Sequence, residues 1–172
     1  HYVYASHEDD YICMSDLHGN PQSLYSEVAG ANSVLHAYDD ISLKYEYLGT
    51  ATYDEGNNNP MFDRLSNLSE VTAYGGISAF SATGGDVLIG IYREKGGSGM
   101  AFRFTNAFAS LNASLNHAYR PFTMGEITLS LTLSDCVSGT LYGKGNAQSV
   151  FAENKRLSFS IPSYGSLFLV LS

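Results

Sequence analysis

The sequence contains no tryptophan, only two cysteines and few basic residues. Nine Lys and Arg against seventeen Asp and Glu give a net charge of −8. This balance disfavours nucleic-acid binding, because a phosphate backbone requires a basic face. No apolar run reaches the roughly 18 residues of a membrane-spanning helix, so no membrane span is expected. No basic stretch followed by an apolar one is found near His1, so no signal peptide is expected. Because the sequence starts at His1 rather than Met, we expect a processed or excised chain.

The 172 residues, 44% of them hydrophobic, are enough for one domain with a sizeable core, or one domain with a short attachment. Thirteen Tyr and seventeen Gly with few Lys are typical of secreted carbohydrate-active domains, which predicts an extracellular or periplasmic location. Cys13 and Cys136 lie far apart in apolar, strand-like contexts. We expect both thiols to be reduced and buried, with a long-range disulfide as the alternative.

Residues 12–38 have the pattern of a strand, a tight turn and a helix. The Gly-Asn-Pro turn at 19–21 combines two residues that tolerate positive φ with one suited to a first helical turn. Asp39 and Asp40 would oppose the helix dipole at a C-terminus, so the helix is expected to end there. Before them, apolar residues recur at helical spacing and form one stripe: Leu24, Val28, Ala31, Leu35 and Tyr38.

From Ile41 the apolar period changes to two, which predicts short strands separated by turns. The run 87–92 is nearly all apolar, so it is expected to be covered on both faces. Segment 100–108 is expected to form an antiparallel pair with the strand at 86–92. The strands are expected at 41–53, 71–80, 86–92, 100–108, 126–133, 137–142, 147–152, 156–161 and 166–171, with a helical turn within 61–68.

These elements predict a mainly β fold, an antiparallel β-sandwich of about eight or nine strands preceded by one strand-turn-helix segment. The segment would occupy residues 1–40 and the sandwich residues 41–172.

Residues 14–32 (MSDLHGNPQSLYSEVAGAN) resemble the last strand-to-helix passage of a (β/α)8-barrel glycoside hydrolase. Residues 160–172 resemble the end of the β-sandwich that follows such a barrel, and the region between matches only in general character. A barrel needs about 250 residues, so only about its last tenth could lie in this chain. The resemblance implies that the catalytic glutamates belong to earlier barrel strands. The matching positions are Asp16, Gly19, Asn20, Pro21, Leu24, Tyr25, Glu27, Val28 and Asn32.

Candidates for catalysis are few. Glycoside hydrolysis requires two carboxylates about 5–9 Å apart. Asp16 is the best single candidate, because it follows the would-be barrel strand, but we expect it to cap the turn before the helix. His18 is expected to be a solvated turn residue, and no nucleophile elbow or zinc spacing occurs. No catalytic residue is therefore assigned.

Sugar binding by aromatic stacking would use tyrosine, because tryptophan is absent. Tyr45, Tyr47 and Tyr53 fall on one parity of an expected strand, next to a polar loop. We therefore predict Tyr47, Tyr53 and Asn58 as carbohydrate-binding residues. The alternative is that these tyrosines pack in the sandwich core or against the helix.

The polar loop at 54–60 also carries enough oxygen atoms for a structural Ca²⁺ ion, which takes six to eight oxygen ligands. The spacing differs from the EF-hand pattern, and Asn-Gly loops are common without metal. We therefore expect no cofactor, with structural Ca²⁺ as the alternative. The oxygen-bearing residues are Asp54, Glu55, Asn57, Asn58 and Asn59.

These observations predict a non-catalytic C-terminal accessory β-sandwich of a glycoside hydrolase. Its partners would be carbohydrate and a catalytic barrel, in the same polypeptide or a companion chain, and it would pack on that barrel and help to shape the carbohydrate site. The main alternative is a free-standing carbohydrate-binding module; an adhesin or structural sandwich and a complete small enzyme are also open. The free-standing module predicts an exposed aromatic face, whereas the accessory domain predicts an exposed apolar helix stripe.

Overall fold

The computed structural model describes residues 15, 20–21, 25–26, 28–30, 32, 38–56, 59, 62–107, 125–143, 146–163 and 165–172. The chain divides into two compact units, His1–Leu43 and Lys44–Ser172. In the first unit, Ser15 and Pro21 form an isolated antiparallel bridge on either side of the expected turn. The described residues between 25 and 32 are helical, as the apolar stripe predicts. The predictions for Cys13, Asp16 and His18 lie outside the described residues. The same holds for three of the five residues of the apolar stripe: Leu24, Ala31 and Leu35.

The segment after Tyr38 is helical, so the prediction of a strand beginning at Ile41 is wrong. Helix α2 spans Asp39–Lys44, and the Ile41 amide donates a hydrogen bond to the carbonyl of Tyr38 (3.1 Å). The aspartates that were expected to end one helix instead begin another, where a negative charge is favourable, and Lys44 lies in its last turn. Within this segment only Ile41 and Leu43 are apolar, and two residues are too few to distinguish the period of a strand from that of a helix.

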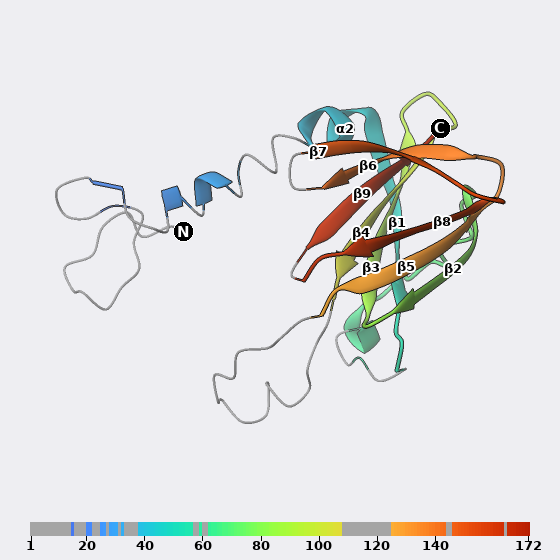
Figure 1. The fold of residues 1–172 in the computed structure, drawn as a ribbon, viewed down its shortest axis with the longest axis horizontal. Helices are drawn as coiled ribbons and strands as arrows, with labels where there is room; N and C mark the ends of the chain where they lie inside the picture. Colours follow the sequence, from blue (N-terminus) through green and yellow to red (C-terminus); the bar gives the residue numbers. More distant parts are fainter. Residues whose placement is uncertain are drawn as a thin grey trace. The chain divides into compact units, whose positions relative to one another are not determined.

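The described part of Lys44–Ser172 forms nine strands in two antiparallel sheets, which confirms the expected β-sandwich (Figure 1). The six-stranded sheet has the order β1-β3-β4-β9-β6-β7, and the three-stranded sheet has the order β2-β5-β8. A short 3-10 turn, η1 (Phe62–Arg64), confirms the expected helical turn. The strands are β1 (Tyr45–Tyr53), β2 (Ile77–Thr83), β3 (Val87–Glu94), β4 (Met100–Asn106), β5 (Ile127–Leu133), β6 (Ser138–Gly143), β7 (Asn146–Phe151), β8 (Arg156–Ile161) and β9 (Ser166–Leu171).

The core lies between the two sheets and is built from alternate residues of the strands. Aromatic rings join the layers. Phe80 of β2 stacks on Phe104 of β4 with ring centroids 5.8 Å apart, and Phe104 meets Phe159 of β8 edge-on at 5.7 Å. The strand expected at 126–133 is β5, and four alternate side chains of it are at most 1% exposed: Ile127, Leu129, Leu131 and Leu133.

Strand β3 is fully buried on one face and only partly covered on the other. Val87, Ile89 and Ile91 are completely buried, whereas the alternate residues, including Leu88 and Tyr92, are half-buried. The strand does pair with β4, as expected. Its apolar run therefore predicted an interior strand correctly but overestimated the cover on the outer face.

The expected strand at 71–80 begins later than predicted. Residues 71–74 form a turn, and Gly75 and Gly76 follow with positive φ of 86° and 82°. Such backbone angles are incompatible with a strand, and they delay β2 to Ile77. The glycine pair is the local signal that marks this boundary.

Candidate functional site

Five aromatic side chains gather on the side of the six-stranded sheet that points away from the core. They come from β1, β3, β6 and β9, and the strand register places them together. We call this group the outer aromatic face; its members are Tyr45, Tyr47, Tyr92, Tyr142 and Phe168.

The rings of the outer aromatic face touch one another across strands. The ring centroids of Tyr47 and Tyr92 are 5.7 Å apart, and those of Tyr92 and Phe168 are 5.3 Å apart. Tyr45 meets Phe168 edge-on at 6.5 Å, and Tyr142 lies directly opposite Phe168 in the register of β6 and β9. These contacts make one continuous aromatic surface from the edge strand β1 to β6.

A glycine in β3 makes room for this surface. A Cβ atom added at Gly90 would lie 2.9 Å from the nearest ring carbon of Tyr92, so the ring of Tyr92 lies over the glycine. Arg103 of β4 stands opposite Gly90 in the register, and its guanidinium lies 3.5 Å from the hydroxyl of Ser166. The aromatic surface therefore includes a positive charge and a hydroxyl.

Exposure varies strongly across the face. Phe168 is only 7% exposed, although it points away from the core, whereas Tyr47 is 60% exposed. The Tyr47 hydroxyl shares a hydrogen bond with the side-chain hydroxyl of Thr50, and its ring meets Tyr92 edge-on. Tyr47 is thus an exposed ring held in a fixed orientation, which suits stacking on the C–H groups of a sugar.

Tyr45, a member of the outer aromatic face, has a raised pKa. Burial is the main cause, because it disfavours the phenolate and raises the pKa of Tyr45 above its usual value. The nearby carboxylate of Glu94 raises it further, as does Tyr142. The interior of the aromatic face therefore resists negative charge.

Tyr53 lies on the opposite side of the sheet from Tyr47, so the expectation of one shared parity is wrong. The register between β1 and β3 shifts between Tyr47 and Gly49, which inserts one extra residue and reverses the alternation. Tyr53 therefore pairs with the buried Val87 and packs edge-on against Phe80, with centroids 5.4 Å apart. Asn58, the third predicted residue, lies outside the described residues.

The polar loop after β1 is held by its own hydrogen bonds. Both oxygens of Asp54 accept backbone amides, from Gly56 (3.1 Å) and from Asn59 (2.7 Å). Asp86 accepts the backbone amide of Glu55 (3.1 Å) and the side-chain amide of Asn59 (2.7 Å). Asn59 is only 2% exposed, so this loop closes around a buried amide. Its carboxylates stabilise the loop through N–H donors.

Part of the calcium prediction falls outside what the structure describes, because Asn57 and Asn58 are not described. Within the described ranges, no group of three or more His, Cys, Asp or Glu side chains could hold a metal ion. Cys136 is a half-buried free thiol against the core. No helix among the described residues is long and apolar enough to cross a membrane.

Sequence reasoning did not find three members of the outer aromatic face. Tyr92, Tyr142 and Phe168 lie in different strands, and only the pairing of β1, β3, β6 and β9 brings them together. A local signal did exist. In β3 and β9 these aromatics have the parity opposite to that of the buried aliphatic residues, which marks the outer face.

No protein-family model matches the chain, and no curated protein or solved structure does.

Proposed function

We propose that this chain is a non-catalytic accessory β-sandwich of a glycoside hydrolase, which packs on the catalytic barrel and helps to shape the carbohydrate site. The observation that carries the proposal is the order of its parts. A segment that resembles the last strand-turn-helix of a barrel leads into an antiparallel two-layer sandwich.

The chemistry of the described carboxylates supports a non-catalytic role. A glycosidase pair needs one carboxyl group that can donate a proton and a second that can act as base or nucleophile. Asp54 and Asp86 instead accept backbone and amide N–H groups within the loop. The oxygens of both carboxylates are therefore engaged in holding the loop.

Only one of the five rings of the outer aromatic face is exposed, so we assign this face to contact with the barrel rather than to a free-standing binding surface. Its rings are apolar and mostly half-buried, and they lie side by side across four strands. The barrel's outer helices present an apolar surface that such a face can cover. Tyr47 lies on the edge strand and is the most exposed ring of the face.

The proposal is tested with the purified 172-residue chain and a panel of aryl glycosides of different sugars and anomers. We expect no release of the aryl alcohol above the uncatalysed rate. Saturable hydrolysis that survives repurification on a second column would overturn the proposal, because it would require a complete active site in this chain.

A second candidate is a free-standing carbohydrate-binding module, which the 60% exposure of the Tyr47 ring favours. In this case Tyr47 stacks on a sugar and Arg103 contacts its hydroxyls. The two candidates differ in what Tyr47→Ala does to a chain that binds polysaccharide. The free-standing module predicts that the substitution abolishes binding, whereas the accessory module predicts binding that does not depend on Tyr47.

A further inference from the structure

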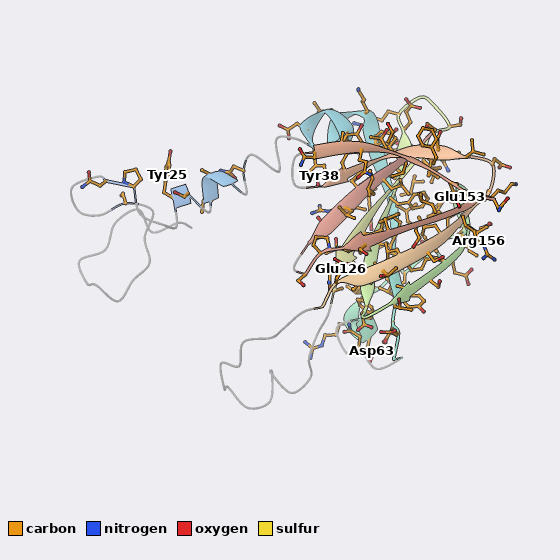
Figure 2. All side chains as sticks on the ribbon, viewed as in Figure 1. Tyr25, Tyr38, Asp63, Glu126, Glu153 and Arg156 are labelled. Atoms are coloured by element: carbon orange, nitrogen blue, oxygen red, sulfur yellow. The ribbon has the colours of Figure 1, made fainter. Side chains whose placement is uncertain are left out.

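A hollow of about 740 Å³ opens where β7 leads into β8. This place is separate from the outer aromatic face, because the hollow includes residues of β5 and β8 from the other sheet. Figure 2 labels Glu153 and Arg156 close together at this connection. The hollow is lined by an aromatic ring, two charged side chains, an amide and two hydroxyls: Phe151, Glu153, Asn154, Arg156, Ser130 and Ser158.

Phe151 is the unusual member of this group, because a phenylalanine ring is 74% exposed. It is the last residue of β7, and its neighbour Val150 packs against the core. The alternation of the strand therefore turns the ring of Phe151 to the outside. A large apolar ring contributes little to folding when it stays in water, but it offers a flat surface to a ligand.

The polar groups of the hollow are held by a tight hairpin. The backbone amides of Glu153 and Arg156 each donate to the carbonyl of the other, at 2.9 Å and 2.8 Å. The two residues between them, Asn154 and Lys155, have positive φ of 52° and 64°, as a two-residue hairpin turn of this kind requires. Lys155 donates to the carbonyl of Ser134, at 2.8 Å. This rigid turn fixes the backbone from which Glu153 and Arg156 extend, which lowers the entropic cost of binding.

The sheet beside the hollow has a neutral surface rich in hydroxyl groups. On the outer face of β2, β5 and β8, the register aligns three rows of side chains, and Arg156 is the only charged one. One hydroxyl of this face, that of Ser158, donates to the carbonyl of Leu129 (2.8 Å). The rows are Thr83–Thr128–Ser160, Ser81–Ser130–Ser158 and Ala79–Thr132–Arg156.

We infer that the hollow at the β7–β8 connection binds a neutral oligosaccharide. Phe151 stacks on the C–H face of a sugar ring, while Glu153, Asn154 and Arg156 bind its hydroxyls. The lining carries one carboxylate and one guanidinium, and the ammonium of Lys155 in the same turn donates to the carbonyl of Ser134, which favours a neutral ligand over an anionic one. The rows of hydroxyl groups continue this polar surface along the chain of sugars. The choice of carbohydrate as the ligand class rests on the proposed function.

Affinity electrophoresis of the 172-residue chain tests the inference. The gels contain soluble starch, xylan or mixed-linkage β-glucan, with polygalacturonate as the anionic probe and a gel without polysaccharide as the reference. The variants are Phe151→Ala and Phe151→Tyr, with Val137→Ala as the matched control. Val137 is also an exposed apolar residue (61% exposed) but does not line the hollow. Tyr47→Ala separates the hollow from the outer aromatic face.

We expect at least one neutral polysaccharide to retard the wild-type chain, and Phe151→Ala to weaken this binding at least about tenfold. Phe151→Tyr, Val137→Ala and Tyr47→Ala should keep it. Loss of binding in Tyr47→Ala but not in Phe151→Ala would overturn the inference and favour the free-standing module. Absence of retardation on every neutral gel, or binding to polygalacturonate alone, would overturn it too. These results leave the accessory function untouched, because that function is tested by the absence of hydrolysis.

Discussion

Tyr47 and Tyr53 are six residues apart on one strand, yet they lie on opposite faces of the sheet. An even spacing in a regular strand would place them on the same face. The shift of register between Tyr47 and Gly49 reverses the alternation, so that Tyr47 pairs with Tyr92 on the outside and Tyr53 with Val87 in the core. The two tyrosines therefore have different surroundings: Tyr47 lies on the exposed outer aromatic face, and Tyr53 packs against the core.

This difference predicts opposite effects on stability. Tyr53→Ala removes a ring that packs against Phe80 and the core, and we expect it to lower the free energy of unfolding by about 3 kcal/mol. Tyr47→Ala removes an exposed ring and one hydrogen bond, and we expect a loss of no more than about 1 kcal/mol. Urea titrations followed by circular dichroism measure both. Equal losses would contradict the assignment of Tyr53 to the core.

Removal of calcium is expected to leave the thermal midpoint unchanged. The carboxylate oxygens of Asp54 and Asp86 already accept N–H groups, and the loop is closed by the buried Asn59. Differential scanning calorimetry in EDTA and in excess CaCl₂ measures the effect. A midpoint that rises with calcium concentration would show an ion bound to the folded state, and the hydrogen-bonded loop would then need another explanation.

The raised pKa of Tyr45 predicts how stability changes at high pH. The folded state keeps this proton to a higher pH than the unfolded chain, whose tyrosines titrate near the usual 10.0. The contribution of Tyr45 to stability is therefore complete below about pH 10 and is lost as the pH rises through its folded-state pKa.

Tyr45→Phe should remove that part of the alkaline loss of stability. Glu94→Gln should lower the pKa of Tyr45 only in part, because burial is the larger cause. Ultraviolet difference titration of the phenolate, compared with the Tyr45→Phe variant, measures both effects. A Tyr45 that titrates at or below its usual value would contradict its burial in the outer aromatic face.

Two glycines with similar backbone angles should differ in their tolerance of alanine. Gly84 and Gly75 have φ of 97° and 86°, so alanine is strained at both. At Gly84 a Cβ atom would also lie 2.8 Å from the carbonyl oxygen of Glu126, whereas nothing lies within 4 Å at Gly75. We expect Gly75→Ala to cost about 1 kcal/mol of stability and Gly84→Ala at least twice as much. Equal chemical-denaturation midpoints would contradict the close approach at Gly84.

The sequence predicted the strands whose core side chains alternate over a long run. In β5 four alternating aliphatic residues form the buried face, and in β4 Phe102 and Phe104 do the same beside the exposed Arg103. Such patterns are local, because one strand carries the whole signal. The class of fold followed from their number and spacing.

The remaining features depend on partners that are distant in the chain. The register shift in β1 is defined by its pairing with β3, and it separated Tyr53 from Tyr47. The outer aromatic face needs the order of the six-stranded sheet, which places β9 between β4 and β6. Phe151 could have been noticed from the parity of β7, but its hollow requires the neighbouring sheet. These are tertiary effects, and residue spacing does not encode them.

The most direct test of the proposed accessory function is to read the coding sequence upstream of His1 and to measure the intact mass of the natural protein. The accessory function predicts about 250 residues of alternating strand and helix before His1, with two glutamates or aspartates at the ends of barrel strands. The accessory function would be contradicted if the coding sequence began near His1 and the intact mass matched a protein that starts there.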